Sequence, residues 1–118
     1  MSAERHYQEW PSKIATLREQ APDVAAGFGT MFQRLMRDGA LSVREKELIA
    51  FAIGMSLRCE PCIYAHVEKA LRSGATREQI LEAAGVVVMM QGGPGYVHVP
   101  AVIEALDALG AETQGANS

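Results

Sequence analysis

The spacing of hydrophobic residues along this 118-residue chain predicts helices throughout. A first helix is expected over about 3–20, where Pro11 could restart or kink it. A second is expected over about 22–37. Its apolar residues recur at near-helical spacing and predict one buried stripe: Phe28, Met31, Phe32 and Leu35. The β-rich run at 86–88 lies within a longer helical pattern, so no strand is expected there.

Capping patterns mark the next three helices. Residues 42–45 read Ser-Val-Arg-Glu, a capping box that opens a third helix reaching about residue 57. Pro61 suits the first position of a fourth helix, where its missing N–H costs nothing, and this helix should end at 73–74. Residues 76–79 read Thr-Arg-Glu-Gln, a second capping box that opens the fifth helix.

The later part of the fifth helix, 83–90, is apolar nearly all round, which predicts burial on every side. Because a few short helices can hardly enclose one of their own number, we expect a subunit interface to cover it. Residues 92–95 are a Gly- and Pro-rich break, and a last helix is expected over about 96–109. The sequence thus predicts a single all-α domain over 1–118, with its core at about 20–110 and a flexible tail at 111–118.

The composition narrows the class of protein. Hydrophobic residues make up 48% and charged residues 21%, as in ordinary globular domains. The net charge is −3 and no Lys/Arg cluster is present, so neither nucleic acid nor an anionic membrane is an expected partner. No apolar run is long enough to cross a membrane, and the first ten residues contain no secretory apolar segment. We therefore expect a cytoplasmic protein.

The candidate chemistry begins with a Cys-x-x-Cys pair, Cys59 and Cys62. In a reducing compartment, two cysteines at this spacing are typical of redox or metal sites rather than structural disulfides. Cys62 is expected in the first turn of its helix, where free N–H groups and the helix dipole stabilise a thiolate. His66 lies one turn later on the same face and leans back toward Cys62, so its imidazole could accept the thiol proton.

Glu47 is the fourth candidate. On the third helix it shares a face with Phe51 and Gly54, and a carboxylate on such a face needs a partner. Antiparallel packing of the third and fourth helices could bring Glu47 toward His66, because the connection between them is short. The carboxylate would then orient the imidazole, as in a relay of nucleophile, base and orienting group.

The pattern Glu47-(x)11-Cys59-x-x-Cys62-x-x-x-His66, followed by a helix that begins at 77–80, resembles the AhpD-like/carboxymuconolactone decarboxylase superfamily, in its alkylhydroperoxidase branch. The resemblance covers roughly 40–110. It implies an AhpD-like bundle of about six helices that assembles as a homo-oligomer, a trimer or a hexamer built as a trimer of dimers.

The resemblance also implies a mechanism. The cysteine matching Cys62 attacks a peroxide and becomes a sulfenic acid, and the one matching Cys59 resolves it as a disulfide. His66 and Glu47 match the proton relay, and neither an organic cofactor nor a metal is required. The substrate would be a hydroperoxide or a protein disulfide, with a reducing protein as partner. The best-studied peroxidases carry another histidine between the cysteines, where this chain has Glu60-Pro61.

Several alternatives stay open at this point. Cys59, Cys62 and His66 could bind zinc with Glu47 as the fourth ligand, although a second Cys or His pair is absent. The protein could instead decarboxylate a lactone or a related small cyclic acid, a branch that typically lacks the cysteine pair. It could also be a non-catalytic, oligomeric redox sensor. A thioredoxin-like fold is rejected, because a capped helix rather than a strand leads into the cysteines.

Other residues receive ordinary interpretations. Cys62 by itself could be a small buried packing residue. His98 is expected at the surface, and His6, near the N-terminus, is expected to play no part in the site. Tyr64 is expected to pack on a different helix face from Cys62.

Overall fold

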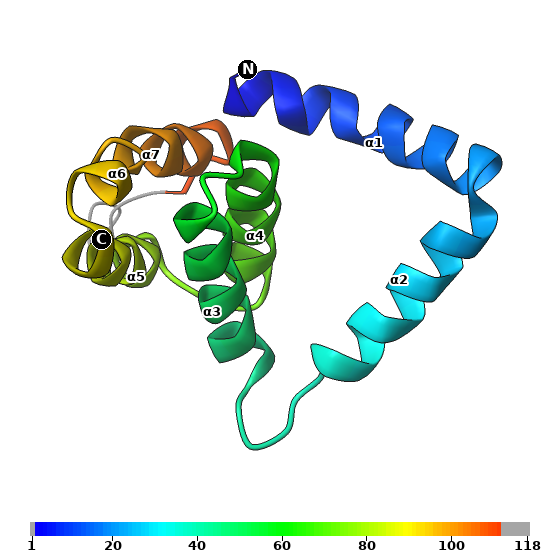
Figure 1. Cartoon of the computed structure of the whole chain (residues 1–118), viewed down its shortest axis with the longest axis horizontal. Coiled ribbons are helices and arrows are strands. Elements are labelled where there is room, and N and C mark those ends of the chain that lie inside the picture. Colours follow the sequence, from blue (N-terminus) through cyan, green and yellow to red (C-terminus); the bar gives the residue numbers. More distant parts are fainter. Residues whose placement is uncertain (1, 112–118) are drawn as a thin grey trace.

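The computed structural model describes residues 2–111, and every regular element in that range is a helix, which confirms the all-α prediction (Figure 1). Six helices have ten residues or more, and α6 has four. The tail expected at 111–118 lies outside the described residues, apart from its first residue. The helices are α1 (Ala3–Gln20), α2 (Pro22–Leu35), α3 (Val43–Ser56), α4 (Glu60–Arg72), α5 (Arg77–Gln91), α6 (Gly93–Tyr96) and α7 (Val99–Ala108).

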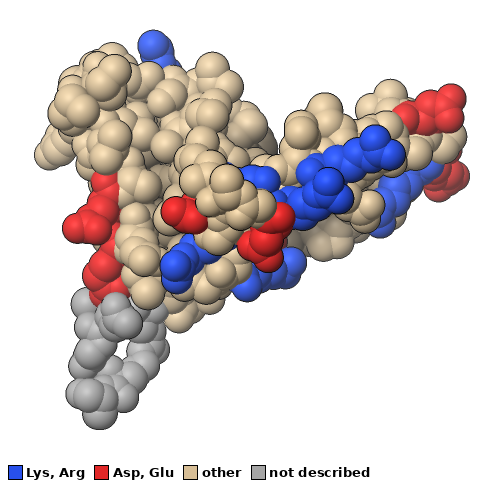
Figure 2. Space-filling model, turned by 90° about the horizontal axis from the view of Figure 1, so that it is seen from below, with Lys and Arg blue, Asp and Glu red and all other residues tan. Residues whose placement is uncertain are grey.

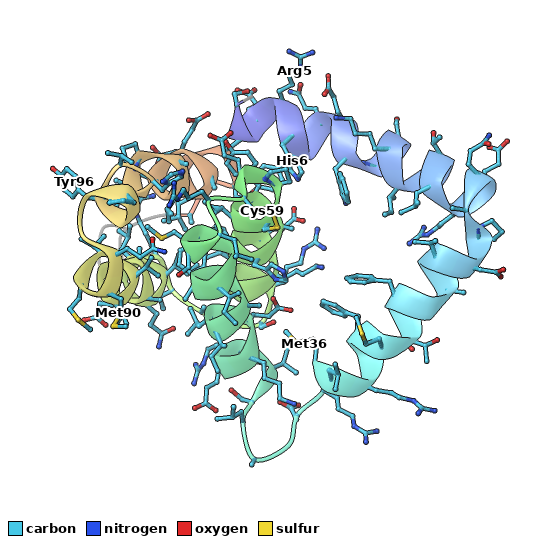
Figure 3. The ribbon with its side chains drawn as sticks, viewed as in Figure 1. Arg5, His6, Met36, Cys59, Met90 and Tyr96 are labelled. Carbon is cyan, nitrogen blue, oxygen red and sulfur yellow. A yellow bond between two sulfur atoms is a disulfide. The ribbon has the colours of Figure 1, made fainter. Side chains whose placement is uncertain are left out.

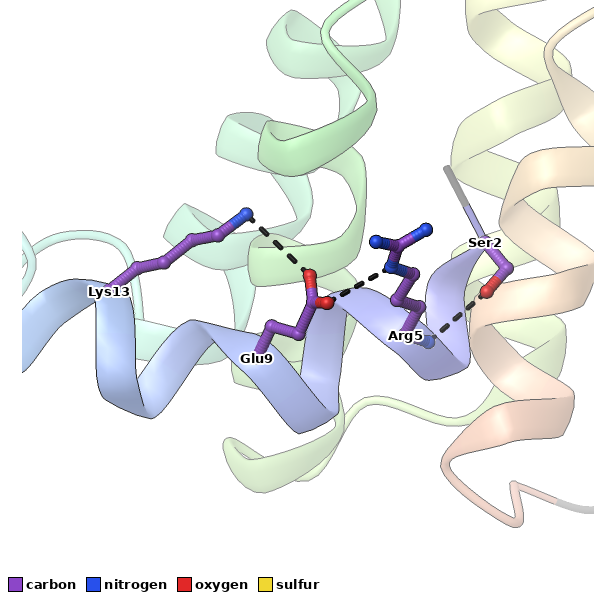
Figure 4. A network of polar contacts seen from close by, with 4 residues as sticks. All are labelled: Ser2, Arg5, Glu9 and Lys13. Carbon is purple, nitrogen blue, oxygen red and sulfur yellow. Dashed lines mark hydrogen bonds and ion pairs between the residues drawn. The ribbon is translucent and has the colours of Figure 1, made fainter.

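Helix α1 is held at its start and solvated along its outer face. The Ser2 hydroxyl caps it by accepting the backbone N–H of Arg5 at 3.1 Å. Glu9 accepts a hydrogen bond from Arg5 at 3.0 Å and pairs with Lys13 at 3.8 Å (Figure 4). Hydrogen bonding from Arg5 lowers the pKa of Glu9. These exposed ion pairs keep one side of α1 in water, so its other side is available for packing.

The first turns of α1 pack against the rest of the chain. The helix continues through Pro11, so this proline neither restarts nor ends it. The backbone N–H of Ala3 donates to Glu104 of α7 at 3.0 Å, and both Ala3 and His6 are buried. The N-terminal end of α1 is therefore fixed beside α4 and α7.

Helix α2 extends from the far end of α1 and, with it, forms an arm that stands away from the other helices in Figure 1. The prediction of a buried stripe on α2 is wrong for the single chain, because α2 has no buried residue and packs mainly against α1. Three of the four predicted stripe residues are between 50% and 62% exposed: Phe28, Met31 and Leu35. The fourth, Phe32, is half-buried and lies under Lys69 of α4, whose Nζ is 4.3 Å from the ring centroid. The helical spacing of these apolar residues was predicted correctly, but in the single chain they form an exposed apolar surface rather than a contact with the core.

Helices α3 and α4 pack closely as an antiparallel pair. The capping box predicted at 42–45 is confirmed, since the Ser42 hydroxyl accepts the Glu45 N–H at 3.0 Å and the Glu45 carboxylate accepts the Ser42 N–H at 2.8 Å. In the turn between the helices Arg58 has a φ of 55°, which costs about 1–2 kcal/mol in a residue with a Cβ. Helix α4 begins at Glu60, so Pro61 occupies its second position rather than the first.

Helix α5 is buried on one side only. Ala84 and Val87 are buried, whereas Val86, Met89 and Met90 are 57%, 71% and 75% exposed (Figure 3). Within one chain 83–90 is therefore covered on one side only, because no second layer of helices in the described range covers the outer face. The subunit interface expected to cover that face stays a prediction. The capping box predicted at its start is confirmed by reciprocal hydrogen bonds between Thr76 and Gln79.

The last helix expected over 96–109 is observed as α7, which begins three residues later than predicted, at Val99, and the Gly- and Pro-rich break expected at 92–95 contains the short helix α6. Gly92 ends α5 with a φ of 68°, and Pro94 then stands within the first positions of α6. Pro100 stands in the first turn of α7, where its missing N–H again costs nothing. Each proline thus restarts the chain as a helix after a short turn.

The core lies between α3, α4, α5 and α7, with one contribution from the start of α1. Its buried apolar residues are Ala3, Phe51, Met55, Ile63, Tyr64, Val67, Ala70, Ala75, Ile80, Ala84, Val87, Val102, Ala105 and Leu106. On the face shown in Figure 2, Lys and Arg side chains gather along the middle, with Asp and Glu side chains among them and at both ends. Among the described residues, no helix combines the length and apolarity that a membrane span needs.

Candidate functional site

A disulfide joins Cys59 and Cys62 at the N-terminal end of α4 (Figure 3). Cys59 is the N-cap residue, and its Sγ accepts the backbone N–H of Cys62 at 3.2 Å. The sulfur occupies the place of the serine or aspartate oxygen that usually caps a helix. Cys62 lies in the first turn of α4, as predicted, and the positive end of the helix dipole acts on Cys59 as well.

Gly54 of α3 lets the cysteine turn come close to its neighbouring helix. A Cβ at this position would lie 2.9 Å from the Cβ of Cys62, closer than real Cβ atoms come to another carbon. The backbone carbonyl of Gly54 also accepts the N–H of Cys59 at 3.1 Å. This glycine therefore allows the end of α3 to support both cysteines at once.

Glu47, which is buried, and His66, which is partly exposed, form a hydrogen-bonded pair one helical turn beyond Cys62 along α4. Glu47 Oε1 lies 2.7 Å from His66 Nδ1, and the side chains are 3% and 21% exposed. A carboxylate accepts the Nδ1–H of the ring, which leaves Nε2 available for proton transfer. The structure brings these two predicted residues together across α3 and α4, and their catalytic roles stay predictions.

Two hollows meet at Cys62 and His66. The larger, about 590 Å³, lies between α1, α2 and α4, and the smaller, about 250 Å³, lies against α3. Cys62 and His66 line both hollows, while Cys59 lines neither. The smaller one is lined by apolar residues of α3 and by its C-cap residue: Ala50, Ile53, Gly54 and Leu57. A molecule in either space can therefore reach the Cys62 sulfur beside an imidazole.

The N-terminal helix contributes a wall of the larger cavity that the sequence did not reveal. His6, Tyr7 and Trp10 line it from α1. The Tyr7 hydroxyl donates to the backbone carbonyl of Tyr64 at 2.6 Å, and burial raises the pKa of Tyr7 well above its ordinary value. Their spacing puts these residues within about one turn of a helix, but nothing in the local pattern identifies the helix that this turn faces.

The remaining predicted residues lie where packing explains them. The ring of His98 donates Nδ1–H to the carbonyl of Pro94 at 2.8 Å in an exposed position, in agreement with a surface role. Tyr64 is buried, and burial together with the nearby Glu60 carboxylate raises its pKa to about 12. Within residues 2–111, no set of three or more histidine, cysteine or acidic side chains is placed to hold a metal ion.

The fold and site define an all-helical protein with a Cys-x-x-Cys disulfide beside a histidine–glutamate pair. The sequence model of the carboxymuconolactone decarboxylase family matches residues 22–105, and the chain belongs to this family. An uncharacterized protein of Cupriavidus necator is 33% identical over 99 residues, 84% of this chain and 88% of that protein. A protein encoded in the cox locus of Paracoccus denitrificans is 44% identical over 72 residues, 61% of this chain and 65% of that protein.

Solved structures show the same fold. A carboxymuconolactone decarboxylase family protein from Legionella pneumophila superposes with a TM-score of 0.79 at 33% identity, covering 92% of this chain and 94% of that one. A Thermotoga maritima member of the family superposes with a TM-score of 0.75 at 24% identity, covering 87% and 88%. For the Thermotoga protein an involvement in an antioxidative response has been suggested. At that identity, the likeness shows the fold alone.

Proposed function

We propose that this protein is a thiol-dependent alkylhydroperoxidase and disulfide oxidoreductase whose site comprises Cys62, Cys59, His66 and Glu47. One observation carries the proposal. Cys62, which forms a disulfide with Cys59, lines a cavity of about 590 Å³ together with His66. The Nδ1 atom of His66 is hydrogen-bonded to the buried carboxylate of Glu47. This arrangement supplies a nucleophile, a base and an orienting group within reach of a small organic molecule.

The first step oxidises Cys62. His66 accepts the thiol proton, and the thiolate attacks the terminal oxygen of the hydroperoxide. A sulfur–oxygen bond forms and the oxygen–oxygen bond breaks, so Cys62 becomes a sulfenic acid and the hydroperoxide is reduced to an alcohol. The proton returns from His66 to the departing alkoxide, while Glu47 stabilises the charged imidazole during the transfer. Neither a metal nor an organic cofactor is needed for this balance.

The second step uses Cys59 as the resolving thiol. Its thiolate attacks the sulfenic sulfur of Cys62, the disulfide forms, and hydroxide leaves and takes a proton to become water. The N-cap position suits this role, because the Cys62 N–H and the helix dipole stabilise a thiolate at Cys59. A dithiol of a reducing protein partner then restores both thiols by exchange. This cycle fits a reducing compartment, and we place the protein in the cytoplasm.

A stoichiometric titration tests the proposal. The fully reduced protein is mixed with one equivalent of tert-butyl hydroperoxide, quenched with an alkylating reagent and weighed by mass spectrometry. We expect the loss of two hydrogens, no alkylated cysteine, and one tert-butanol formed for each disulfide. Protein alkylated before mixing serves as the blank. Free, fully alkylatable thiols after complete mixing would contradict the function.

We further propose that the protein works as a homo-oligomer, a trimer or a hexamer. Two apolar surfaces lack a cover within the described chain: the stripe of α2 and the outer face of α5 with Met89 and Met90. Phe28 of the α2 stripe also lines the Cys62 cavity, so subunit contacts on the arm would shape the site. Exposed apolar surfaces of this kind are typical of subunit interfaces.

The assembly can be disrupted by a single charge. We expect the native protein to elute as an oligomer in size-exclusion chromatography with light scattering. Met31→Glu should raise the dissociation constant at least ~100-fold, because an unpaired carboxylate would be buried at the contact. Gln33→Glu adds the same charge on an exposed polar position of α2 and should leave the oligomer intact. A stable native monomer at micromolar concentration would refute the assembly.

A further inference from the structure

His6 is a buried histidine whose ring nitrogens have no hydrogen-bond partner among the described residues. Its relative exposure is 6%, and neither ring nitrogen makes a hydrogen bond to any residue in 2–111. The side chain comes from the second turn of α1, on the side that faces α4 in Figure 3. The ring nitrogens are not among the fully enclosed polar atoms that lack a partner, so they keep some accessible surface and a hydrogen-bonding group can reach them from the adjoining space.

Three aromatic rings hold His6 in place without satisfying its nitrogens. The imidazole stacks on Trp10, with ring centroids 5.4 Å apart and an interplanar angle of 22°. It meets Tyr7 edge-on at 5.5 Å and Tyr64 at 5.3 Å. The Tyr7 hydroxyl is already committed to the Tyr64 carbonyl, so it leaves the imidazole unpaired. The ring is thus fixed in orientation while its hydrogen-bonding capacity stays available.

The space next to His6 is the cavity that also contains the redox site. His6, Cys62 and His66 all line the hollow of about 590 Å³ between α1, α2 and α4. A ligand small enough to enter can therefore contact the His6 ring on one wall and the Cys62 sulfur on another. No hydrogen bond or ion pair in the described range joins His6 to Cys62 or His66, so only a bound molecule can link them.

The charge state of His6 decides which ligand suits it. Burial lowers its pKa and so does Lys13, while Glu68 acts in the opposite direction. The ring is therefore neutral at physiological pH, with one nitrogen that donates and one that accepts. Its partner should carry an O–H donor next to an oxygen acceptor, on an apolar body that fits among the aromatic side chains. An organic hydroperoxide has this chemistry.

We propose that His6 is a substrate-binding residue of the Cys62 cavity, where a ring nitrogen accepts the hydroxyl hydrogen of an organic hydroperoxide and holds its terminal oxygen toward Cys62. This inference rests on the proposed peroxidase function and adds a contact from α1 to the residues of α3 and α4. His6 transfers no electrons in this scheme and gives up no proton. It lowers the activation free energy by holding the reacting oxygen close to the Cys62 sulfur.

Variants of His6 test the contact kinetically. His6→Phe keeps an aromatic ring against Trp10 but cannot accept a hydrogen bond, whereas His6→Gln keeps an acceptor. We expect His6→Phe to lower the rate constant for oxidation of Cys62 by tert-butyl hydroperoxide roughly tenfold, and His6→Gln to recover most of it. Alkylation of Cys62 by iodoacetamide, which presents no hydroxyl, should be unchanged in both. His98→Phe is the matched surface control.

Two kinetic outcomes would overturn the assignment. His6→Phe could oxidise as fast as the native protein, or it could slow oxidation and alkylation equally, which would show a structural role only. If the His6 variants fail to fold, binding can be measured instead in a protein that keeps His6. In the inert Cys62→Ser protein, tert-butyl hydroperoxide should shift the ring NMR signals of His6 and leave those of His98 in place. Unshifted His6 signals would refute the contact.

The same two measurements separate this inference from the function on which it rests. A native protein that consumes no hydroperoxide refutes the peroxidase function, yet binding to His6 can still be read by NMR. A native protein that consumes hydroperoxide at a rate independent of His6 supports the function and refutes the contact.

Discussion

Cys62→Ser is expected to reduce hydroperoxide consumption to the uncatalysed background. Cys62 is the one of the two cysteines that lines both hollows, and it shares each of them with His66. A serine hydroxyl at this position is a far weaker nucleophile toward oxygen, and the neighbouring imidazole does not change that. The loss should therefore exceed a thousandfold, equivalent to more than ~4 kcal/mol in the barrier. Peroxide-consumption assays with the native protein and both single variants measure it.

Cys59→Ser is the matched control, because it removes a sulfur that lines neither hollow. This variant should react once with hydroperoxide and then stop at a Cys62 sulfenic acid, which dimedone traps for mass spectrometry. Full turnover in Cys62→Ser would refute the assignment. So would a sulfenic acid that forms on Cys59 in the native protein.

The variant lacking both cysteines separates the alternative functions. Conversion of a lactone or a small cyclic acid that survives loss of both thiols would point to decarboxylation, with His66 and Glu47 as the proton-transfer groups. Slow peroxide turnover combined with an oxidation-dependent change of oligomeric state would point to a redox sensor. The disulfide and the family match are compatible with each of these functions. The cysteine variants are therefore the experiment that distinguishes the three functions.

The helix starts and the Glu47–His66 contact, which were predicted correctly, depend on local sequence. The capping boxes at 42–45 and 76–79 fix where α3 and α5 begin, because each satisfies orphan backbone N–H groups within four residues. The short turn between α3 and α4 then leaves antiparallel packing as the simple solution. That packing brings Glu47 to His66 over a sequence separation of 19 residues.

The parts that sequence reasoning missed depend on long-range placement. The period of α2 is correct, but a period cannot say whether a stripe faces a core or stays exposed on an arm. His6 lies 56 positions before Cys62, and only the docking of α1 onto α4 and α7 brings both to one cavity. Cys59 was missed as an N-cap for a smaller reason: the helix starts one residue earlier than the proline predicted.

The Glu47–His66 pair is expected to govern stability as well as chemistry. His66→Ala should lower the free energy of unfolding by about 3 kcal/mol, because it leaves the 3%-exposed Glu47 carboxylate without its partner in the interior. The cost comes from the charge left behind rather than from the lost bond. Urea unfolding of the fully reduced proteins measures it, so that the disulfide does not contribute.

A double-mutant cycle distinguishes this explanation from simple loss of packing. Adding Glu47→Gln to His66→Ala replaces the stranded carboxylate with a neutral amide, so the double variant should be more stable than His66→Ala. His98→Ala removes an imidazole from an exposed position and should change stability by less than about 1 kcal/mol. Equal instability of the single and double variants would contradict the buried charge as the cause. The single variant Glu47→Gln retains an acceptor for the His66 Nδ1–H. If this variant folds stably and its Cys62 is oxidised more slowly, the carboxylate acts on the imidazole separately from its effect on folding.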